Sequence, residues 1–332
     1  NRREQCILVG NAVPPLLSAK IANEIKKHII NKDYQAVNKD LVRKKFEKNS
    51  SKIIEFKSKK KTKLFMDLFS GVGGFSIGLK RAGYEHLLSA DNDKSVVKTH
   101  KFNFANIPII EEGLQTKEAE NKILKIIDNR KVDLLVGGPP CQGFSIFGKR
   151  RFINTKDFDP KTDKRNNLVL TFWNYVKLIQ PNWVIMENVG GFPSLENGYF
   201  LRKIVTLLPT IGYKNFDYRI LNTADYGVPQ KRKRFILIAN KTGNLIPWPK
   251  PKFFAVPKDW QKAHRTVGQV ITDLSTDISR SRVSNHEPMK HSKEIRERYS
   301  YVEEGKKMDV NVLPEKLKLA KYTGKPIKNF SH

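Results

Sequence analysis

Hydrophobic residues follow two regular patterns over the middle of the chain. Short apolar runs, such as residues 64–69 and 132–136, are followed within two residues by Gly, as buried strands often are. Longer stretches, such as residues 167–178, repeat apolar positions at helical spacing. This alternation predicts an α/β fold with a doubly wound, mostly parallel sheet. The predicted strands are 64–69, 86–90, 132–136, 183–186, 218–221 and 234–239, and the predicted helices are 75–82, 94–102, 117–129, 167–178 and 201–211.

The N-terminal residues show a different pattern. Apolar residues 7–9 precede Gly10-Asn11, which predicts a short strand followed by a turn. A helix is expected after Pro14-Pro15, because proline is tolerated in the first helical turn and apolar residues recur every four positions from Leu17 to Ile29.

Composition divides the chain into four segments. Residues 1–30 form the N-terminal motif and helix, and residues 31–63 are polar and strongly basic, which indicates a linker. Residues 64–240 carry the α/β pattern. Residues 241–332 are rich in Pro, Lys, Ser and His, so a separate, irregular small domain is expected there.

The chain is strongly basic, with 62 Lys and Arg against 33 Asp and Glu and a formal net charge of +29. Such an excess attracts polyanions, and DNA is the commonest of them. An anionic membrane surface is the weaker alternative, because no long basic amphipathic helix stands out. No run of eighteen apolar residues could span a bilayer, so we predict no membrane segment.

Only two cysteines occur, Cys6 and Cys141. They make no disulfide framework, which favours a reducing cytoplasm, and no Cys/His cluster has zinc-ligand spacing. We therefore predict no bound metal.

A glycine-rich stretch, Asp67-Leu-Phe-Ser-Gly-Val-Gly-Gly-Phe75, follows the first predicted strand of the sheet. Glycines at a strand-to-helix turn let the backbone approach a ligand closely. The second strand ends at Asp91, about twenty residues on, where a carboxylate can accept hydrogen bonds from ribose hydroxyls. The alternative is a helix cap, because Asp91, Asn92 and Asp93 precede a helix.

Cys141 lies in Gly-Gly-Pro-Pro-Cys141-Gln-Gly-Phe-Ser, directly after the strand 132–136. A lone cysteine is usually a buried structural residue. A strand-end loop bounded by Gly and Pro is a poor place for a core side chain, so a thiolate nucleophile is favoured.

Two further charged positions lie near strand ends. Glu187 follows four apolar residues, and a carboxyl group there is costly unless it has a partner or a function. Arg232 and Arg234 lie where the strand 234–239 begins, and strand alternation sends both side chains to the same side. We expect this strand to pair with residues 218–221 as a hairpin-like edge.

Taken together and in this order, these stretches resemble the DNA (cytosine-5) methyltransferase family. The resemblance covers residues 5–30 and 64–240 and is weak over 31–63 and 241–332. It implies methyl transfer from S-adenosyl-L-methionine to carbon 5 of a flipped-out cytosine in double-stranded DNA, through a covalent Cys141 adduct. It further implies a bacterial restriction–modification system, with the enzyme in the cytoplasm and associated with the nucleoid.

The resemblance also implies a role for each matching residue. Glu187 would bond ring nitrogen 3 and the exocyclic amine of the base, Arg234 would hold its carbonyl oxygen, and Arg232 would lie near Cys141. Residues 64–240 would form the catalytic domain and 241–332 the target-recognition domain. The implied cofactor contacts are Asn11, Val13, Phe69, Gly71, Gly73, Asp91, Asn92 and Pro139, and the implied mobile DNA-binding loop contains Ser145, Lys149, Arg150, Arg151 and Arg165.

Three features depart from the family pattern. The Gly10-Asn-Ala-Val-Pro-Pro15 motif normally comes last, which suggests a circularly permuted order. The Asp that usually bonds the adenine amine is absent, with Gly113 in its place and Glu112 as a possible substitute. A further motif is not visible, so residues 241–332 are predicted to be an incomplete recognition domain that needs a longer chain or a second small subunit.

Two other functions remain open. A non-catalytic DNA-binding subunit on the same fold would not need Cys141, Glu187 and Arg234. An RNA cytosine methyltransferase would share the chemistry and differ in its recognition region. Methyl-transfer assays on duplex DNA and on tRNA would distinguish these possibilities.

Overall fold

The computed structural model describes residues 8–30, 62–140, 167–271, 291–303, 306 and 308–318. The chain divides into two compact units, Asn1–Val270 and Ile271–His332. Residues beyond Asn240 therefore continue the first unit as far as Val270, so the expected boundary at residues 240 and 241 does not separate the units. The recognition role of residues 241–332 stays a prediction.

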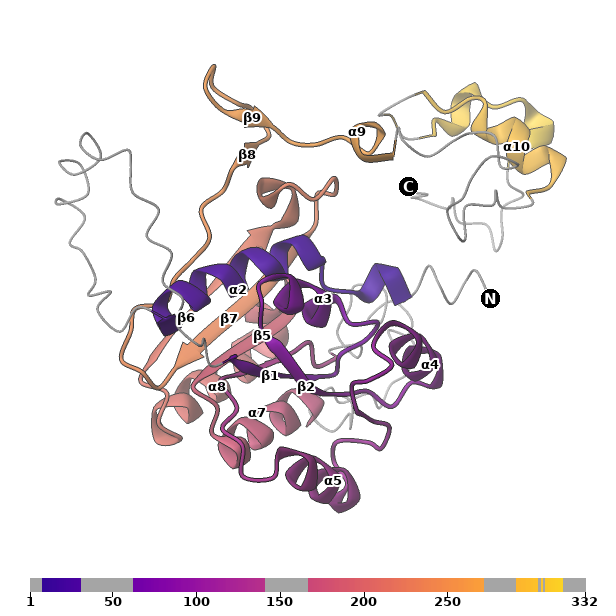
Figure 1. The fold of residues 1–332 in the computed structure, drawn as a ribbon. Coiled ribbons are helices and arrows are strands. Elements are labelled where there is room, and N and C mark those ends of the chain that lie inside the picture. Colours follow the sequence, from indigo (N-terminus) through magenta and orange to yellow (C-terminus); the bar gives the residue numbers. More distant parts are fainter. Residues whose placement is uncertain are drawn as a thin grey trace. The chain divides into compact units, whose positions relative to one another are not determined.

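A seven-stranded sheet forms the centre of the first unit, in the order β3-β2-β1-β4-β5-β7-β6 (Figure 1). Neighbouring strands pair in parallel except β7, which is antiparallel to both β5 and β6. This confirms the doubly wound, mostly parallel sheet. The strands are β1 Leu64–Leu68, β2 Glu85–Ala90, β3 Ile109–Ile110, β4 Leu134–Gly137, β5 Trp183–Val189, β6 Asn215–Asn222 and β7 Lys233–Asn240.

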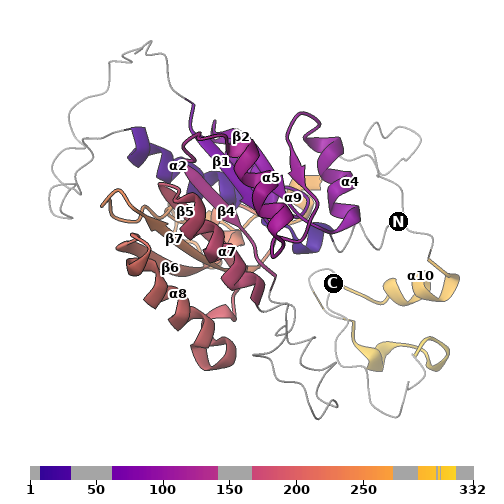
Figure 2. The same ribbon diagram turned by 90° about the horizontal axis from the view of Figure 1, so that it is seen from below.

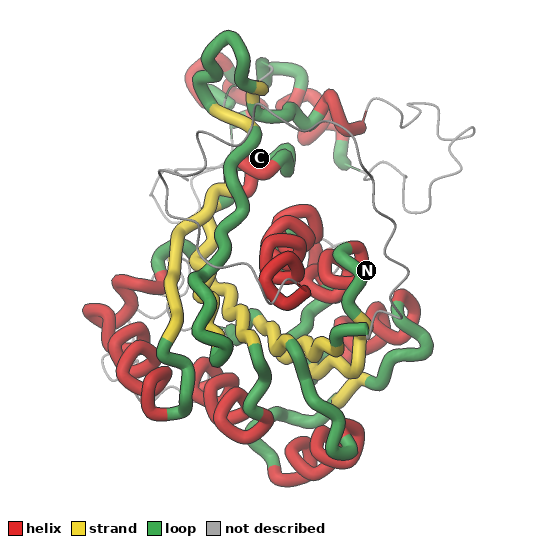
Figure 3. Tube along the Cα trace, turned by 60° about the vertical axis from the view of Figure 1, so that its left-hand side comes forward, coloured by secondary structure: helices red, strands yellow, loops and turns green. Residues whose placement is uncertain are grey.

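Helices cover both faces of this sheet (Figures 2 and 3). On one face, α5, α7 and α8 bury their apolar sides against alternate residues of the strands, including Met66, Leu135 and Met186. On the other face, α2 and α3 pack against the intervening residues, including Phe65, Val136 and Ile185. The helices are α2 Pro15–Ile30, α3 Gly74–Arg81, α4 Lys94–Asn103, α5 Lys117–Ile127, α7 Asn167–Ile179 and α8 Tyr199–Thr210, with short 3-10 helices η3 Phe192–Gly198 and η4 Thr223–Tyr226.

The remaining described elements are short. In the first unit, residues Phe253–Phe254 (β8) and Lys262–Ala263 (β9) pair with each other. The short helix α9, Gly268–Ile271, spans the boundary between the two units. The second unit contains α10 (Lys293–Tyr299), η6 (Val310–Val312) and η7 (Glu315–Leu317). Within it, Arg298 Nε donates to the Leu317 carbonyl at 2.5 Å and Lys316 pairs with Glu297 at 2.9 Å.

One expectation about the fold was wrong. Residues 8–11 are helical, with Ala12 N donating to Leu8 O at 3.1 Å, so there is no strand at positions 8 and 9 (residue 7 lies outside the described ranges). Strands β6 and β7 pair antiparallel at one edge of the sheet, as expected, with β6 outermost. Strand β5 also extends through Val189, which places Glu187 within it.

Helices α2 and α3 approach each other closely because α3 contains two glycines. Ser18 Oγ donates to the Gly74 carbonyl at 3.1 Å and to the Pro15 carbonyl at 3.0 Å. A Cβ atom at Gly78 would lie 2.6 Å from Pro15 O, and one at Gly74 would lie 2.9 Å from Val13 N. The predicted helix after Pro15 therefore packs beside the glycine-rich turn, as expected.

We expect Gly78→Ala to lower the free energy of unfolding by about 1–3 kcal/mol, the usual cost of overpacking a close helix contact. The added methyl group would meet backbone atoms of α2 and the Ser18 hydroxyl, which cannot all move aside. Urea denaturation of both proteins measures the change. Gly191→Ala is the control, because a Cβ there meets no atom within 4 Å. Equal stability of the Gly78 variant and the wild type would show that α2 does not pack tightly on α3.

Candidate active site

The candidate site lies at the edge of the sheet where β1, β4 and β5 end and β7 begins. Parallel strands present their carboxyl ends at one edge, and ligands of open α/β sheets bind there. Pairing of Val189 with Arg234 and of Leu68 with Gly137 brings these strand ends side by side. The edge therefore gathers the glycine-rich turn, Pro139, Glu187 and Arg234.

Glu187 and Arg234 form an ion pair at this edge. Arg234 Nε lies 2.7 Å from Glu187 Oε1, and side-chain exposure is 16% for Arg234 and 10% for Glu187. Burial raises the pKa of Glu187 to about 7, although the positive charges of Arg234 and Arg232 oppose the rise. A carboxyl group with such a pKa can hold or release a proton near neutral pH.

The segment before Cys141 is fixed to the end of β5. Asn188 is buried, and its Nδ2 donates to the Pro139 carbonyl at 3.1 Å. A Cβ atom at Gly138 would lie 3.2 Å from Glu187 Oε2, so the backbone there passes beside the carboxyl group. Sequence reasoning missed Asn188, although a polar residue directly after Glu187 in a buried strand is a usable signal.

Several predicted residues lie outside the described ranges. They are Cys141 and the loop residues Ser145, Lys149, Arg150, Arg151 and Arg165. Pro140 is the last described residue before Cys141. The roles of all six residues stay predictions.

Arg232 links the N-terminal motif to this edge. Its guanidinium donates to the Gly10 carbonyl and, at 3.4 Å, to the Ala12 carbonyl. These bonds join residues more than two hundred positions apart and hold Asn11 and Val13 beside the start of β7. In the described part of the chain, Arg232 therefore contacts backbone carbonyls of this motif. Its predicted position near Cys141 is not tested.

The glycine-rich turn is built from residues in the left-handed region. Phe69, Gly71 and Gly73 have φ values of 56°, 52° and 86°. Glycine is needed at position 73, because a Cβ there would lie 2.9 Å from Phe104 Cζ. A Cβ at Gly71 would meet nothing within 4 Å, so open space adjoins the backbone at that point.

Asp91 is tied to this turn. Its Oδ2 accepts from Gly71 N at 2.9 Å, and its Oδ1 accepts from Asp93 N at 3.0 Å. The N-cap of α4 is Asp93, whose carboxylate accepts from Ser95 N and Val96 N. Asp91 is therefore not the helix cap. Its carboxylate is half-buried between these two backbone groups, and burial raises its pKa.

Asp67 accepts hydrogen bonds from Ser76 in the first turn of α3, which follows the glycine-rich turn. It is fully buried, and its Oδ2 accepts from Ser76 N at 3.2 Å and from Ser76 Oγ at 2.7 Å. Burial raises the pKa of Asp67 to about 8, against the opposing effect of these hydrogen bonds. A neutral Asp67 carboxyl group avoids burying a charge in the sheet and still hydrogen-bonds to the first turn of α3. Sequence reasoning gave Asp67 no role of its own.

The region expected to contact adenine contains an ion pair. Glu112 forms an ion pair with Lys122, so the charge of this possible substitute is already matched. A Cβ at Gly113 would lie 3.0 Å from Gln115 Oε1 and 3.9 Å from Asn92 Nδ2. Two polar side chains therefore flank Gly113.

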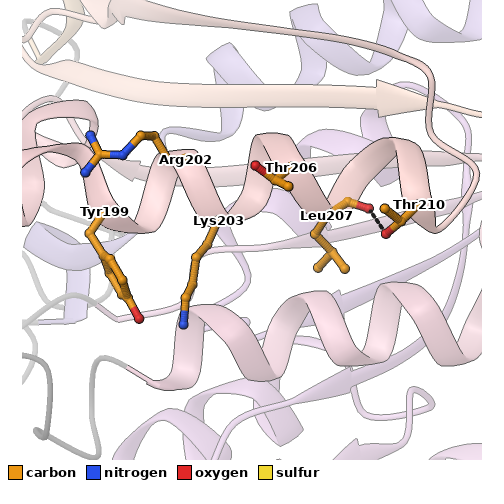
Figure 4. A pocket seen from close by; sticks show the side chains of 6 residues that line it. All are labelled: Tyr199, Arg202, Lys203, Thr206, Leu207 and Thr210. Carbon is orange, nitrogen blue, oxygen red and sulfur yellow. Dashed lines mark hydrogen bonds between the residues drawn. The ribbon is translucent and has the colours of Figure 1, made fainter.

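A separate groove of about 510 Å³ follows α8 (Figure 4). Lys203 Nζ lies 4.6 Å from the centre of the Tyr199 ring in this groove. None of the predicted site residues lines it. In the described ranges no helix is long and apolar enough to cross a membrane.

Comparisons with known proteins agree with this geometry. Type II methyltransferase M1.HphI of Haemophilus parahaemolyticus is 37% identical over 258 residues, which are 76% of this chain and 64% of that protein. Type II methyltransferase M.XorII of Xanthomonas oryzae pv. oryzae is 34% identical over 212 residues, 63% of this chain and 46% of that protein. The chain thus spans about half to two thirds of the length of these curated relatives.

A solved structure shows the same fold. It is a prophage-encoded protein from E. coli, described as a DNA modification methyltransferase, with a TM-score of 0.50 and 27% identity. The match covers 65% of this chain and 56% of that one. The family model for C-5 cytosine-specific DNA methylases matches residues 64–329. The chain therefore belongs to the C-5 cytosine-specific DNA methylase family.

Proposed function

We propose that this chain transfers a methyl group to carbon 5 of cytosine in double-stranded DNA. The observation that carries the proposal is the buried Glu187–Arg234 pair, 2.7 Å apart, beside the segment that leads to Cys141. A non-catalytic DNA-binding subunit needs no buried carboxyl group with a pKa near 7 at this position.

The chemistry assigns a task to each residue. Cytosine is a poor nucleophile at carbon 5, and addition of the Cys141 thiolate to carbon 6 moves an electron pair toward carbon 5. Glu187, while protonated, donates to ring nitrogen 3 and balances the charge that develops there. Arg234 lies against Glu187 and can hold the carbonyl oxygen of the base. Because a base inside a duplex cannot reach this edge, the target must be flipped out.

The turn and Asp91 fit S-adenosyl-L-methionine as the methyl donor. The left-handed backbone at Phe69, Gly71 and Gly73 leaves open space at Gly71, and Asp91 offers carboxylate oxygens at the same loop. We propose that these residues, with Asn92, Pro139, Asn11 and Val13, hold the cofactor. When bound, S-adenosyl-L-methionine supplies an electrophilic methyl group.

We expect Asp91→Ala to weaken binding of S-adenosyl-L-methionine by about tenfold to a hundredfold, the effect of losing hydrogen bonds to a charged group. The substitution removes the proposed acceptor of the ribose hydroxyls and also frees Gly71 N. Isothermal titration calorimetry measures the affinity.

Asp93→Ala is the matched control, because Asp93 caps α4 and lies two residues away. It should lower thermal stability through the lost cap and leave the affinity nearly unchanged. If Asp93→Ala weakened binding as much as Asp91→Ala, both carboxylates would affect binding by stabilising the loop, and Asp91 would not be shown to bind the ribose.

The substrate class follows from an assay with two arms. The protein is incubated with S-adenosyl-L-methionine and either genomic DNA or tRNA, and the nucleosides are analysed for 5-methylcytosine by mass spectrometry. Methylation of DNA alone supports the proposal. Methylation of tRNA alone would make the chain an RNA methyltransferase, and no product with either would contradict methyl transfer by this chain on its own.

We further propose that the enzyme is the modification part of a bacterial restriction–modification system, since relatives carry the name Type II methyltransferase. In this proposal residues 64–240 hold the chemistry and 241–332 recognise the target. The cytoplasmic, nucleoid-associated location, the permuted motif order and the second small subunit stay predictions from the sequence.

A further inference from the structure

Three cationic side chains come from α2 and from the residues that flank β8 and β9, and both α2 and β8 contact η4. They are Lys20 of α2, Lys252, which precedes β8, and Arg265, which follows β9. Within the described ranges, none of the three forms an ion pair with an acidic side chain. Some exposed lysines of the first unit have such partners, including Lys101 with Glu111, Lys117 with Glu120, and Lys122 with Glu112 and Glu118.

The β8–β9 segment is held in place by η4. Lys252 N donates to the Asp225 carbonyl at 3.0 Å, and His264 Nε2 lies 2.9 Å from Asp225 Oδ1. Asp225 Oδ1 also accepts from Asn222 at 2.9 Å. Asp225 is thus already engaged with η4 and His264, and forms no ion pair with Lys20, Lys252 or Arg265 within the described ranges.

Aromatic packing fixes Arg265. The Phe253 ring lies against Gly227, where a Cβ would be 2.7 Å from Phe253 Cε2. The Arg265 guanidinium lies 5.5 Å from the centre of the same ring. The Phe253 ring, packed on Gly227, therefore holds the Arg265 guanidinium in place. The guanidinium nitrogens can still donate to a ligand.

Lys20 lies close to the other two cations. Helix α2 contacts η4, which also contacts β8. Burial lowers the pKa of Lys20, and the charges of Lys252 and Arg265 lower it further. Lys252 and Arg265 therefore act on Lys20 as like charges.

The cluster belongs to the same edge as Glu187. Helix η4 connects β6 to the residues before β7, and Thr223 N donates to the Arg232 carbonyl at 2.9 Å. Arg234, two residues further on, pairs with Glu187. The Glu187–Arg234 pair and η4, which holds the β8–β9 segment, are thus joined by a direct backbone hydrogen bond between Thr223 and Arg232.

We propose that Lys20, Lys252 and Arg265 form a phosphate-binding site for the backbone of the duplex whose flipped base reaches Glu187 and Arg234. This inference rests on the proposed function. A duplex beside this edge of the sheet presents phosphates next to the extruded nucleotide, and three cations without ion-pair partners at a fixed place suit such a contact. The site would orient the duplex without reading its sequence.

The test uses the full chain and the triple variant Lys20→Gln, Lys252→Gln, Arg265→Gln. Binding of a short random-sequence DNA duplex is followed by fluorescence anisotropy over a range of salt concentrations. Each phosphate contact contributes a slope of about −0.9 to the plot of log affinity against log salt. The triple variant should therefore lose about 3 from the slope and bind roughly a hundredfold more weakly near about 0.15 M salt.

The control carries the same loss of charge at the opposite edge of the sheet. Lys125 and Lys177 lie in the last turns of α5 and α7, and Lys131 precedes β4. Lys125→Gln, Lys131→Gln, Lys177→Gln together should keep the wild-type slope, because helices that return to a parallel strand end at its amino edge. Binding of S-adenosyl-L-methionine checks that both variants are folded.

The outcomes separate this inference from the proposed function. A wild-type slope in the triple variant, or an equal loss in the control, would overturn the phosphate site even if the protein methylates DNA. A loss confined to the triple variant supports the site even if no methyl transfer is found. Weaker binding of tRNA with unchanged binding of DNA would also overturn it.

Discussion

Cys141→Ser should reduce methyl transfer to DNA by at least about 10⁴-fold, on the scale of removing a covalent nucleophile. A neutral hydroxyl adds to carbon 6 of cytosine far less readily than a thiolate, because the serine hydroxyl is almost never ionised near neutral pH. Transfer of labelled methyl groups to genomic DNA measures the change.

Position supports this expectation. Gly137 ends β4 at the carboxyl edge, and Asn188 anchors Pro139, two residues before Cys141, to the end of β5. The described backbone therefore passes beside the Glu187 carboxyl group at Gly138, three positions before Cys141 in the sequence. Cys141→Ser should leave folding and binding of S-adenosyl-L-methionine intact, since neither depends on the thiol.

The chain offers a matched control in its other cysteine. Cys6→Ser should retain normal turnover, because Cys6 lies outside the predicted chemistry. DNA with 5-fluorocytosine at the target should trap the wild type and the Cys6 variant as covalent complexes on a denaturing gel, since fluorine cannot leave carbon 5 as a proton does. Near-normal methylation by the Cys141 variant, or trapping of that variant, would show that the thiol is not the nucleophile.

Local patterns predicted most of the catalytic edge. Strand β1, the glycine-rich turn and α3 follow from an apolar run, a cluster of glycines and helical spacing, all within about twenty residues. Glu187 was identified because a carboxyl group inside an apolar strand is costly. In each case the physical reason lies in neighbouring residues, so the sequence alone contains it.

Contacts between distant segments were not predictable in this way. The bonds from Arg232 to the Gly10 and Ala12 carbonyls depend on the whole fold, and so does the packing of Ser18 on Gly74. The strand expected at residues 7–9 failed because three apolar residues fit a helical turn as well as a strand, and no neighbour in the sequence decides between them. The cluster of Lys20, Lys252 and Arg265 joins residues from opposite ends of the first unit.

Glu187→Gln should slow methyl transfer by about 10²–10⁴-fold, the range for loss of a positioned general acid. An amide is close in shape to a carboxyl group and can still hydrogen-bond the base, but it cannot supply a proton to ring nitrogen 3. Single-turnover rates with saturating DNA and cofactor isolate this step from binding. Glu85→Gln is the control, because Glu85 is exposed at the start of β2.

The pH dependence of the single-turnover rate gives a second test of Glu187 as the proton donor. Because the pKa of Glu187 is raised to about 7, the protonated form decreases as the pH rises through 7, and the single-turnover rate of the wild type should fall with it. The Gln variant has no proton to lose, so this decrease should disappear. The Glu85 variant should keep the wild-type profile.

The pH dependence of the free energy of unfolding should show that the Glu187→Gln variant is slow for a reason other than unfolding. A glutamate in the unfolded chain has an ordinary pKa of 4.5, so between that value and about 7 the folded protein holds a proton on Glu187 that the unfolded chain has lost. Folding therefore takes up a proton in this window, and the wild type loses stability as the pH rises through it. The Gln variant lacks this loss, so its stability relative to the wild type should improve from about pH 5 to about pH 7. If the Gln variant is slow and its stability relative to the wild type improves over that range, it has lost the proton and kept the fold. Unchanged turnover would show that Glu187 is not the proton donor.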